Sequence, residues 1–335
     1  MRSPSLFSLL LRLIAIAALL ALPWMVTSEY YVNIASQVVV AAILALSLNL
    51  LVGFGGMISL GHAAYLGVAA YLSIYLTAHA GFGHLAGALI AIGATTMLAM
   101  LFGYLALRAS GLGFLMITLA LGQILWGVAY RWASLTGGDN GLGGLKRPHP
   151  FGFNLMDPAS FYYFAFAFLG IALWCIAHFV QSALGQSLQG TRDQPRRMRA
   201  LGYNVWLIQW LSFVFAGFWG AIAGLLYAYY HQFVSPQTLH LTTSAETLLM
   251  VIAGGSGTLL GPMVGAALVV ILKNVVSAYI TRWLILLGVI FVVIVLFMPE
   301  GLVPGITHWV RSLRSRPRAN RAAADTPSIV KDSAR

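Results

Sequence analysis

The sequence predicts an all-α, polytopic helical membrane protein, and three observations support this fold class. Of the 335 residues, 60% are hydrophobic and only 8% are charged, and the mean hydropathy is +0.86. A soluble domain carries about 25% charged residues. Apolar runs long enough to cross a bilayer as a helix, roughly 20 residues, recur from Leu6 to Met298. The alternating segments of about ten residues that are typical of a transmembrane β-barrel are not visible.

The apolar runs place the predicted helices in chain order. Their residues are 6–26, 32–52, 57–79, 85–107, 112–132, 159–180, 205–230, 246–276 and 283–298. The first run, flanked by Arg2 and containing Arg12, could mimic a signal peptide. We favour a retained first span, because further spans follow directly and the long Arg12 side chain can reach the membrane surface.

The block 246–276 is about ten residues longer than one perpendicular span requires. The stretch AGGSGTLLGP, from Ala253 to Pro262, interrupts it. We therefore expect this block to enter the membrane and return as two helices broken at the glycines. The sequence then predicts about 8–10 transmembrane helices, including this glycine-broken pair.

Basic residues predict the orientation. With the N-terminus inside, the loop 133–158 falls outside and the loop 181–204 falls inside, where the positive-inside rule places arginines. The arginines gather in this loop and in the tail: Arg192, Arg196, Arg197 and Arg199, then Arg311, Arg314, Arg316, Arg318 and Arg321. The net charge of +11 therefore indicates membrane topology rather than nucleic-acid binding. Residues 1–310 are predicted to form one transmembrane domain, and 311–335 a disordered basic cytoplasmic tail.

Motifs of enzymes and cofactor sites are missing from the sequence. The single Cys175 lies in an apolar run, so an intrachain disulfide is impossible. There is no phosphate-binding G-x-x-x-x-G-K-[ST], no zinc-binding H-E-x-x-H and no G-x-S-x-G nucleophile motif. We therefore expect neither an enzyme nor a metal or cofactor bound by this chain.

Acidic residues are few, and none of the eight lies at the centre of a predicted span. This disfavours an ion-coupled carrier that relies on a buried carboxylate. Glu246 comes nearest, at the predicted start of a helix, where the helix dipole favours a carboxylate. If this protein pumps, its energy is expected to come from another chain.

Most of the 35 glycines are interpreted as packing residues. Helices in lipid associate through close contact, which small residues four apart allow. Three pairs have this spacing: Ala63 and Gly67, Gly220 and Gly224, and Gly261 and Gly265.

The stretch GFGGMISLGH, from Gly53 to His62, carries glycines too densely for packing alone. We expect a turn or a broken helix here, with a second break near 254–261. Discontinuous helices often supply transport sites. The candidate residues of a translocation path or helix break are Asn49, Gly55, Gly56, Ser59, His62, Gly254, Gly255 and Gly257. For His62, a structural hydrogen-bonding role is favoured over a ligand or proton-carrying role.

The loop GQSLQGTRDQPRRMRALGYN, residues 185–204, is the most informative predicted cytoplasmic segment. It could form a short amphipathic element that ends near Gly202, with Pro195 early in a helix. On composition alone, a solvated positive loop is an equally good interpretation. The candidate coupling residues are Arg192, Asp193, Gln194, Arg196, Arg197 and Gly202.

This loop resembles the coupling segment of branched-chain amino-acid ABC permeases of the LivM type, in which an Arg–acidic pair precedes an Arg-Ala sequence. Other motifs follow in the family's order over about residues 32–305. They are Asn49-Leu50, Gly-Gly-x-x-Ser-Leu-Gly-His (55–62), Thr136-Gly137-Gly138 with Gly141-Leu142, Ser235-Pro236, Gly254-Gly255-x-Gly257 with Gly261-Pro262, and Met298-Pro299-x-Gly301-Leu302. In this chain Asp193 stands where glutamate is usual, and Gly190-Thr191 replaces a more common apolar pair.

The resemblance implies the transmembrane permease subunit of an ATP-binding-cassette importer for branched-chain or related hydrophobic amino acids. It implies a multi-pass protein of the bacterial plasma (inner) membrane with both termini in the cytoplasm. Its partners would be the lipid bilayer, a related second permease, two cytosolic ATPases that bind the ATP, and a periplasmic protein that delivers the small-molecule substrate. Alternatives are a permease of the same family for urea, short amides or aromatic acids, a stand-alone carrier or channel, and a membrane scaffold.

Overall fold

The computed structural model describes residues 20–21, 23–24, 28–147, 155–277, 279, 283–298 and 300–305. Five of the described helices are long and apolar enough to cross a membrane. They are α2 continued by the π-helix η1 (Glu29–Phe54), α4 (His84–Ala106), α5 (Leu112–Arg131), α7 (Pro158–Gln181) and α10 (Val205–His231). The chain is therefore a polytopic helical membrane protein, as the composition predicts. The predicted span 6–26 lies largely outside the described residues, and the tail 311–335 lies wholly outside them.

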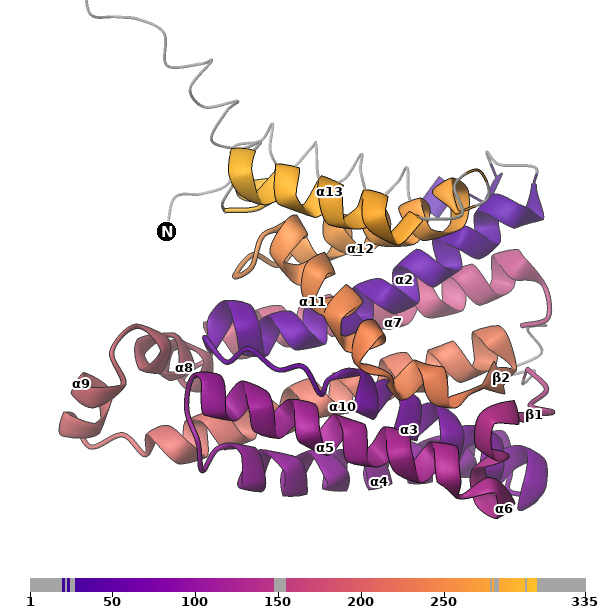
Figure 1. Ribbon diagram of the computed structural model, residues 1–335, viewed down its shortest axis with the longest axis horizontal. Helices are drawn as coiled ribbons and strands as arrows, with labels where there is room; N and C mark the ends of the chain where they lie inside the picture. Colours follow the sequence, from indigo (N-terminus) through magenta and orange to yellow (C-terminus); the bar gives the residue numbers. More distant parts are fainter. Residues whose placement is uncertain are drawn as a thin grey trace, which may run out of the picture.

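Two of these helices form the centre of the bundle. In its most apolar window, α2 is 78% buried and α10 is 72% buried, against 22% for α5 and α7. In Figure 1, α2 runs through the middle of the molecule, with α3, α4 and α5 on one side and α11, α12 and α13 on the other. The rest of the described chain thus leaves most of the apolar surface of the outer helices uncovered, whereas α2 and α10 are packed within the protein.

Side-chain caps fix the start of several helices, because the first N–H groups of a helix have no partner inside it. The Asp157 carboxylate accepts from Ser160 N at the start of α7, where Pro158 occupies the first helical position. The Asn204 side chain accepts from Leu207 N at the start of α10. These caps explain why both helices begin within a residue of the predicted boundary.

The predicted span 57–79 is wrong at its start. The helix α3 begins only at Ala63 and ends at Ile74, continued by the π-helix η2 (Tyr75–His79). Residues 55–62 are not helical, since Gly56 has φ +66°, a conformation that favours glycine. The second span therefore ends in a glycine-rich connection that runs within the protein.

The block 246–276 is broken as predicted, although its first helix begins earlier. This helix, α11, spans Leu241–Gly254, and α12 (Gly261–Ile271), continued by the π-helix η6 (Leu272–Val276), runs back beside it. A Cβ on Gly265 would overlap the carbonyl of Met250, so the two helix backbones are in direct contact. The helix α13 (Trp283–Phe297) lies against α11 and η6 at the outer face of this pair (Figure 1).

The two ends of the bundle carry different structures, as Figure 1 shows. At the left end, the short helices α8 (Ala183–Asp193) and α9 (Pro195–Ala200) connect α7 to α10; we call this the basic end. At the opposite end lie α6 (Ala133–Thr136), the turns η3 (Gly138–Asn140) and η5 (Pro236–Leu239), and the antiparallel strands β1 (Leu142–Gly143) and β2 (Phe233–Val234). The described parts of the loops 133–158 and 181–204 are therefore at opposite ends of the protein.

Arg147 closes the opposite end. Its guanidinium donates to the carbonyls of Tyr229 and Tyr230, each at 2.9 Å, and to that of Leu155 at 3.0 Å. These tyrosine carbonyls belong to the last turn of α10, where unpaired C=O groups and the helix dipole favour a cation. Burial lowers the pKa of Arg147, and the neighbouring Tyr230 offsets part of that shift.

Candidate functional site

The two predicted helix breaks lie against each other and form what we call the glycine junction: Gly53–Gly56 and Gly254–Thr258. Asn49, fully buried in α2, joins them. Its side-chain oxygen accepts from Gly257 N at 3.0 Å, and its amide nitrogen donates to Thr258 O at 2.9 Å. One amide therefore satisfies both a donor and an acceptor of a non-helical backbone segment, as the membrane interior requires.

Glycine is required at the junction because the backbones touch. A Cβ on Gly53 would overlap the backbone nitrogen of Gly257. Gly255 has φ +118° and Gly257 has φ +80°, both in the region that favours glycine. A Cβ on Gly301 would overlap Gly255 in the same way, so the closing segment of the chain also packs here.

Arg192 connects the basic end to the glycine junction. Its guanidinium nitrogen Nη1 donates to the carbonyl oxygen of Gly53. Its Cγ lies 2.8 Å from where a Cβ of Gly56 would be, so its aliphatic stem lies directly on that glycine. Gly53 is in the last turn of η1, where carbonyls lack helical partners and attract cations. Arg192 thus bonds to the backbone of the junction.

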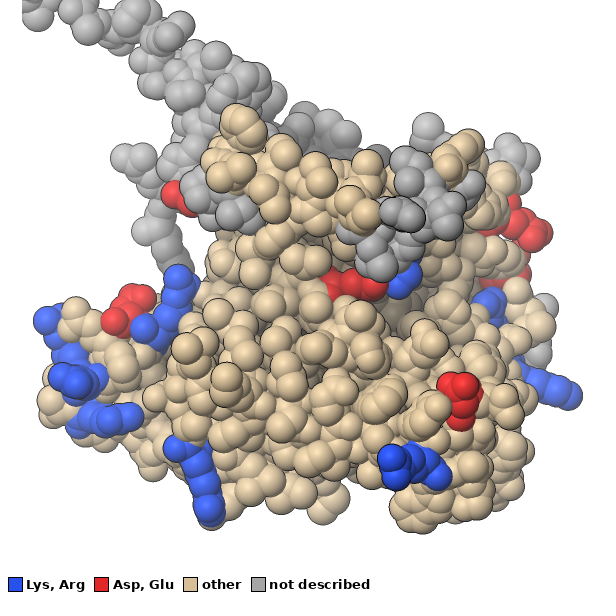
Figure 2. Space-filling view, viewed as in Figure 1, with Lys and Arg blue, Asp and Glu red and all other residues tan. Residues whose placement is uncertain are grey.

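The other predicted coupling residues face outward. Asp193, Gln194, Arg196 and Arg197 are exposed around the turn from α8 to α9. Gly202 follows α9 with φ +88° and open space where a side chain would be. The predicted amphipathic element is therefore two short helices. Figure 2 shows lysine and arginine side chains gathered at this end, while the middle of the same face is almost uncharged.

His62 is fully buried, and its Nε2 lies 2.7 Å from Ser47 Oγ. The Ser47 hydroxyl donates to Leu44 O at 2.7 Å, so the serine oxygen accepts the proton of His62 Nε2. The ring packs edge-on against Tyr65 and close to Gly220. Ser59, also buried, accepts from Gly61 N at 3.4 Å. Both residues hold the connection 55–62 in place, and neither lines the cavity described next.

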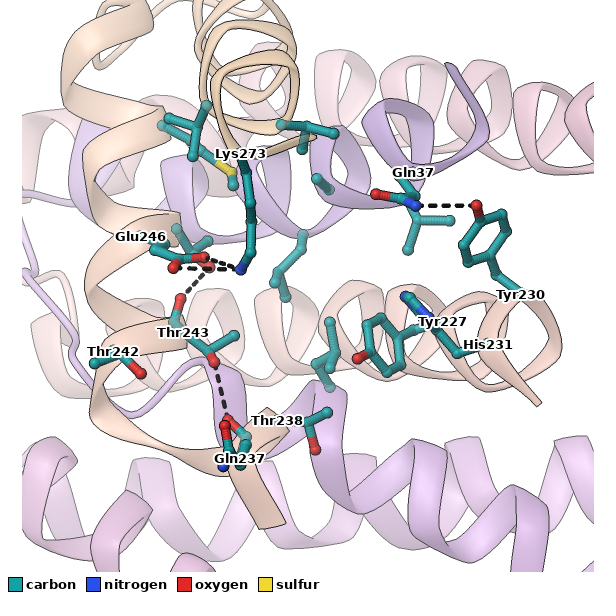
Figure 3. A pocket seen from close by; sticks show the side chains of 18 of the residues that line it. Gln37, Tyr227, Tyr230, His231, Gln237, Thr238, Thr242, Thr243, Glu246 and Lys273 are labelled. Atoms are coloured by element: carbon teal, nitrogen blue, oxygen red, sulfur yellow. Dashed lines mark hydrogen bonds and ion pairs between the residues drawn. The ribbon is translucent and has the colours of Figure 1, made fainter. Parts of the chain in front are cut away.

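Sequence reasoning missed a cavity of about 510 Å³ between α2, α10, α11 and α12 with η6. We call it the ion-pair cavity, because Lys273 Nζ and Glu246 Oε2 meet there at 3.0 Å. Figure 3 shows this pair on one side and Gln37, Tyr230 and His231 on the other. Among the described residues, the Lys273–Glu246 pair is the one salt bridge of the structure.

The position of Glu246 corrects the sequence analysis. His240 caps the helix, its ring nitrogen accepting from Thr242 N at 3.3 Å, so α11 begins at Leu241. Glu246 is therefore the sixth residue of the helix, with a lysine as partner, and does not cap its start. The first turn of α11 was not predicted, because the sequence Thr242-Thr243-Ser244 is polar and precedes the apolar run. The predicted position of Glu246 at the start of a helix is therefore wrong: the residue lies within α11.

The sequence contains a signal that predicts the Glu246–Lys273 ion pair. Glu246 and Lys273 are the charged residues of the block 246–276. They lie 12 and 15 residues from position 258, at the middle of the break. Two helices that rise about 1.5 Å per residue would bring them to similar depths. The predicted break thus implied their pairing.

The described residues form no group of three or more His, Cys, Asp or Glu side chains that could hold a metal ion. The described part of the chain offers instead a cavity and a hydrogen-bonded link between the basic end and the broken helices. The ion-pair cavity is large enough for a small ligand, since ligand pockets measure about 300–1,000 Å³. The glycine junction joins the α11–α12 pair of this cavity to the basic end.

Comparisons with known proteins agree with this architecture. Residues 30–296 match the family described as branched-chain amino acid transport system / permease component. Two similar proteins are the high-affinity branched-chain amino acid transport system permease proteins LivM of Salmonella typhimurium and Escherichia coli. The first is 26% identical over 318 residues, covering 88% of this chain and 74% of the relative. The second is 27% identical over 307 residues, covering 85% and 72%. No solved structure matches the chain. Because the family match spans most of the chain, this protein belongs to the permease components of branched-chain amino acid ABC transport systems.

Proposed function

We propose that this chain is the transmembrane permease subunit of an ABC importer for branched-chain or related hydrophobic amino acids, and forms half of the translocation path. A related second permease would supply the other half. Two cytosolic ATPases would bind and hydrolyse the ATP, and a periplasmic binding protein would deliver the substrate. This chain itself would bind no cofactor.

The observation that carries this proposal is the contact between Arg192 and Gly53. It links an exposed basic helix pair, suited to dock an ATPase, to the backbone of the two broken helices. A displacement of α8 would be transmitted through the guanidinium to Gly53, and through Asn49 to Gly257 and Thr258. The geometry thus supports energy entering from another chain.

The same arrangement supports an orientation in the bacterial plasma membrane. The exposed arginines at the basic end favour the cytoplasm by the positive-inside rule, which leaves the loop 133–158 outside. To check this, Cys175 is replaced by alanine and one cysteine is introduced at Gln194 or at Asp139. In intact spheroplasts an impermeant maleimide is expected to label the Asp139 position only. The reverse pattern would contradict the orientation.

Docking and transmission can be separated by mutation. The double substitution Arg196→Glu/Arg197→Glu reverses exposed charges, and we expect it to lower recovery of the ATPases with the tagged chain in mild detergent. Arg192→Ala removes an inward contact, so it should keep the ATPases but lower ATP-driven amino-acid uptake. Arg131→Glu, an exposed arginine at the opposite end, is the control.

Mass spectrometry of the wild-type pull-down is the first measurement. A second permease and two ATPases are the expected partners. Recovery of this chain alone, as a stable homo-oligomer that transports without ATP, would contradict the proposal and favour a stand-alone carrier. ATP-driven uptake of urea, short amides or aromatic acids, with no uptake of amino acids, would keep the importer but change the substrate.

A further inference from the structure

The ion-pair cavity combines two charges with an apolar wall. The wall is formed by side chains from α2, α11 and α12: Val40, Ala41, Leu44, Met250, Val269 and Val270. Across from it lie the polar groups of Gln37, Tyr227, Tyr230 and His231. A ligand that fits this lining has an aliphatic part beside a strongly polar part.

The two charges are costly where they stand. Ionisable side chains within transmembrane segments are rare and mark functional sites by default. A salt bridge that is only partly buried is also weak evidence for a stabilising role, since solvent screening and desolvation offset its attraction. The Glu246 side chain is 16% exposed and that of Lys273 is 51% exposed, so the lysine is open to the cavity. The pair is therefore accessible to a ligand.

Lys273 lies on an unusual stretch of backbone. It is the second residue of the π-helix η6, and π-helical turns occur frequently at functional sites. The next residue, Asn274, donates to Gln37 Oε1 at 2.9 Å, and Gln37 Nε2 donates to the Tyr230 hydroxyl at 3.0 Å. This chain of bonds ties η6 to α2 and α10. The backbone that carries Lys273 is thus held by side-chain hydrogen bonds to α2 and α10, and its side chain reaches Glu246 on α11.

Charge balance selects among ligands. A carboxylate ligand without an ammonium group would compete with Glu246 for Lys273 and leave one acidic group unpaired. An amine without a carboxylate would do the reverse. A neutral amide has no charge with which to separate the pair. A zwitterion inserts with its ammonium toward Glu246 and its carboxylate toward Lys273, so one ion pair becomes two and the net charge of the cavity stays zero.

We propose that the ion-pair cavity binds the zwitterionic head group of an aliphatic α-amino acid, with Glu246 pairing its ammonium and Lys273 its carboxylate. The proposal rests on the proposed function, because it makes the permease itself a selective step of amino-acid import. The apolar wall then receives the side chain. Anionic aromatic acids and urea are discriminated against at this point of the path.

The test measures binding of radiolabelled L-leucine to the purified permease–ATPase complex in nanodiscs, without the binding protein. We expect 4-methylpentanoate and 3-methylbutylamine, which each lack one charge, to compete at least about tenfold less well than leucine. Glu246→Gln and Lys273→Gln should each weaken leucine binding by about tenfold, as expected when one charge-assisted hydrogen bond is lost. Glu29→Gln and Lys146→Gln, which alter exposed side chains, are the matched controls.

The swapped variant Glu246→Lys/Lys273→Glu tests whether the pair binds the ligand or only holds α11 and η6 together. It keeps an ion pair between α11 and η6, so a purely structural role predicts normal assembly and normal leucine binding. Our proposal predicts normal assembly with binding still lost, because the wall fixes the orientation of the ligand. Wild-type binding by the swap, or equal binding of benzoate or urea to the wild type, would overturn the proposal.

Assembly of the complex tests the proposed importer function, whereas leucine binding tests the cavity proposal. If the complex assembles and imports amino acids with ATP while Glu246→Gln binds leucine normally, only the cavity proposal is overturned. If the chain purifies alone but binds leucine through the ion pair, the importer is overturned and the cavity proposal stands.

Discussion

The glycine junction and the ion-pair cavity use the same pair of helices, α11 and α12, in opposite ways. Beside the junction the two helices meet backbone to backbone, with Gly254, Gly261 and Gly265 excluding any side chain from the contact. Farther along, the same helices line the cavity of about 510 Å³ together with α2 and α10. The comparison shows that this pair combines a tight, rigid end with an open end whose contacts are made by long side chains.

This difference suits the transmission of a movement. Backbone contacts with no free volume transmit displacement, because packed regions are not continuously deformable. Long side chains such as Lys273 exchange partners at little cost. We therefore expect mutations at the junction to affect mainly stability and assembly, and mutations at the cavity to affect mainly transport. Four predictions test this contrast, from the largest expected effect on stability to the smallest.

Gly265→Leu should have the largest effect. Its side chain would overlap the backbone of Met250, and an ideal Cβ would lie 3.0 Å from Gly254 N. Separating the two helices should cost more than about 4 kcal/mol, an exceptional value for one substitution. Size-exclusion chromatography should show loss of monodisperse protein. Gly170→Leu is the control, because open space surrounds Gly170. Wild-type yield for Gly265→Leu would contradict a rigid contact.

His62→Ala should destabilise the protein by roughly 3 kcal/mol, since it removes a fully buried ring and its bond to Ser47. Assembly and uptake should fall together, measured by ATPase co-purification and by transport. Ser47→Ala, which removes only the partner, should have a smaller effect in the same direction. Normal assembly with lost uptake would instead assign His62 to the translocation path.

Asn49→Ala should cost about 2 kcal/mol, because it removes a fully buried amide and leaves the Gly257 N–H and the Thr258 carbonyl without their partner. The matched variant is Asn274→Ala beside the cavity. Asn274 also makes two side-chain hydrogen bonds, but this residue is only half-buried, whereas Asn49 is fully buried. Water can replace those bonds, so we expect a cost of less than about 1 kcal/mol. Thermal melting of the purified complexes compares the two, and equal shifts would remove the distinction between the regions.

Ala41→Leu should have the smallest effect on stability. Ala41 lines the cavity, which has room for the larger side chain, so the free energy of unfolding should change by less than about 0.5 kcal/mol. Uptake of leucine should nevertheless fall more than uptake of alanine, because the larger substrate loses space. A large loss of stability would show that the cavity collapses in the membrane.

Much of the fold could be predicted because it depends on local sequence. Apolar run length located the membrane-length helices, and glycine density located both breaks. The three small-residue pairs were identified as packing sites, but the partners were not. Gly67 packs against Leu239 in η5, and Gly224 against Leu66 in α3. The sequence shows which helix faces carry small residues. Which segment packs against such a face depends on how distant parts of the chain fold together.

Individual residues of the candidate site could be predicted, but their arrangement in space could not. The sequence indicated the importance of Arg192, but could not show that its guanidinium turns inward to a carbonyl 139 residues earlier. Glu246 was misplaced because run length measures hydrophobicity and overlooks a polar first turn. Lys273 was overlooked because its pairing with Glu246 depends on how two neighbouring helices fold together, which run length does not show.

The central position of α2 has a consequence for how the protein is made. This helix is synthesised well before α11 and α12, and Asn49 finds its partners only 208 and 209 residues later in the chain. At roughly 5–20 residues per second, the ribosome needs about 10 to 40 s to reach them. During that interval the amide of Asn49 lacks the partners that it has in the finished protein. We therefore expect α2 to need temporary partners during membrane insertion, and a ribosome stalled before Gly257 should leave that helix exposed to crosslinking by the membrane-insertion machinery.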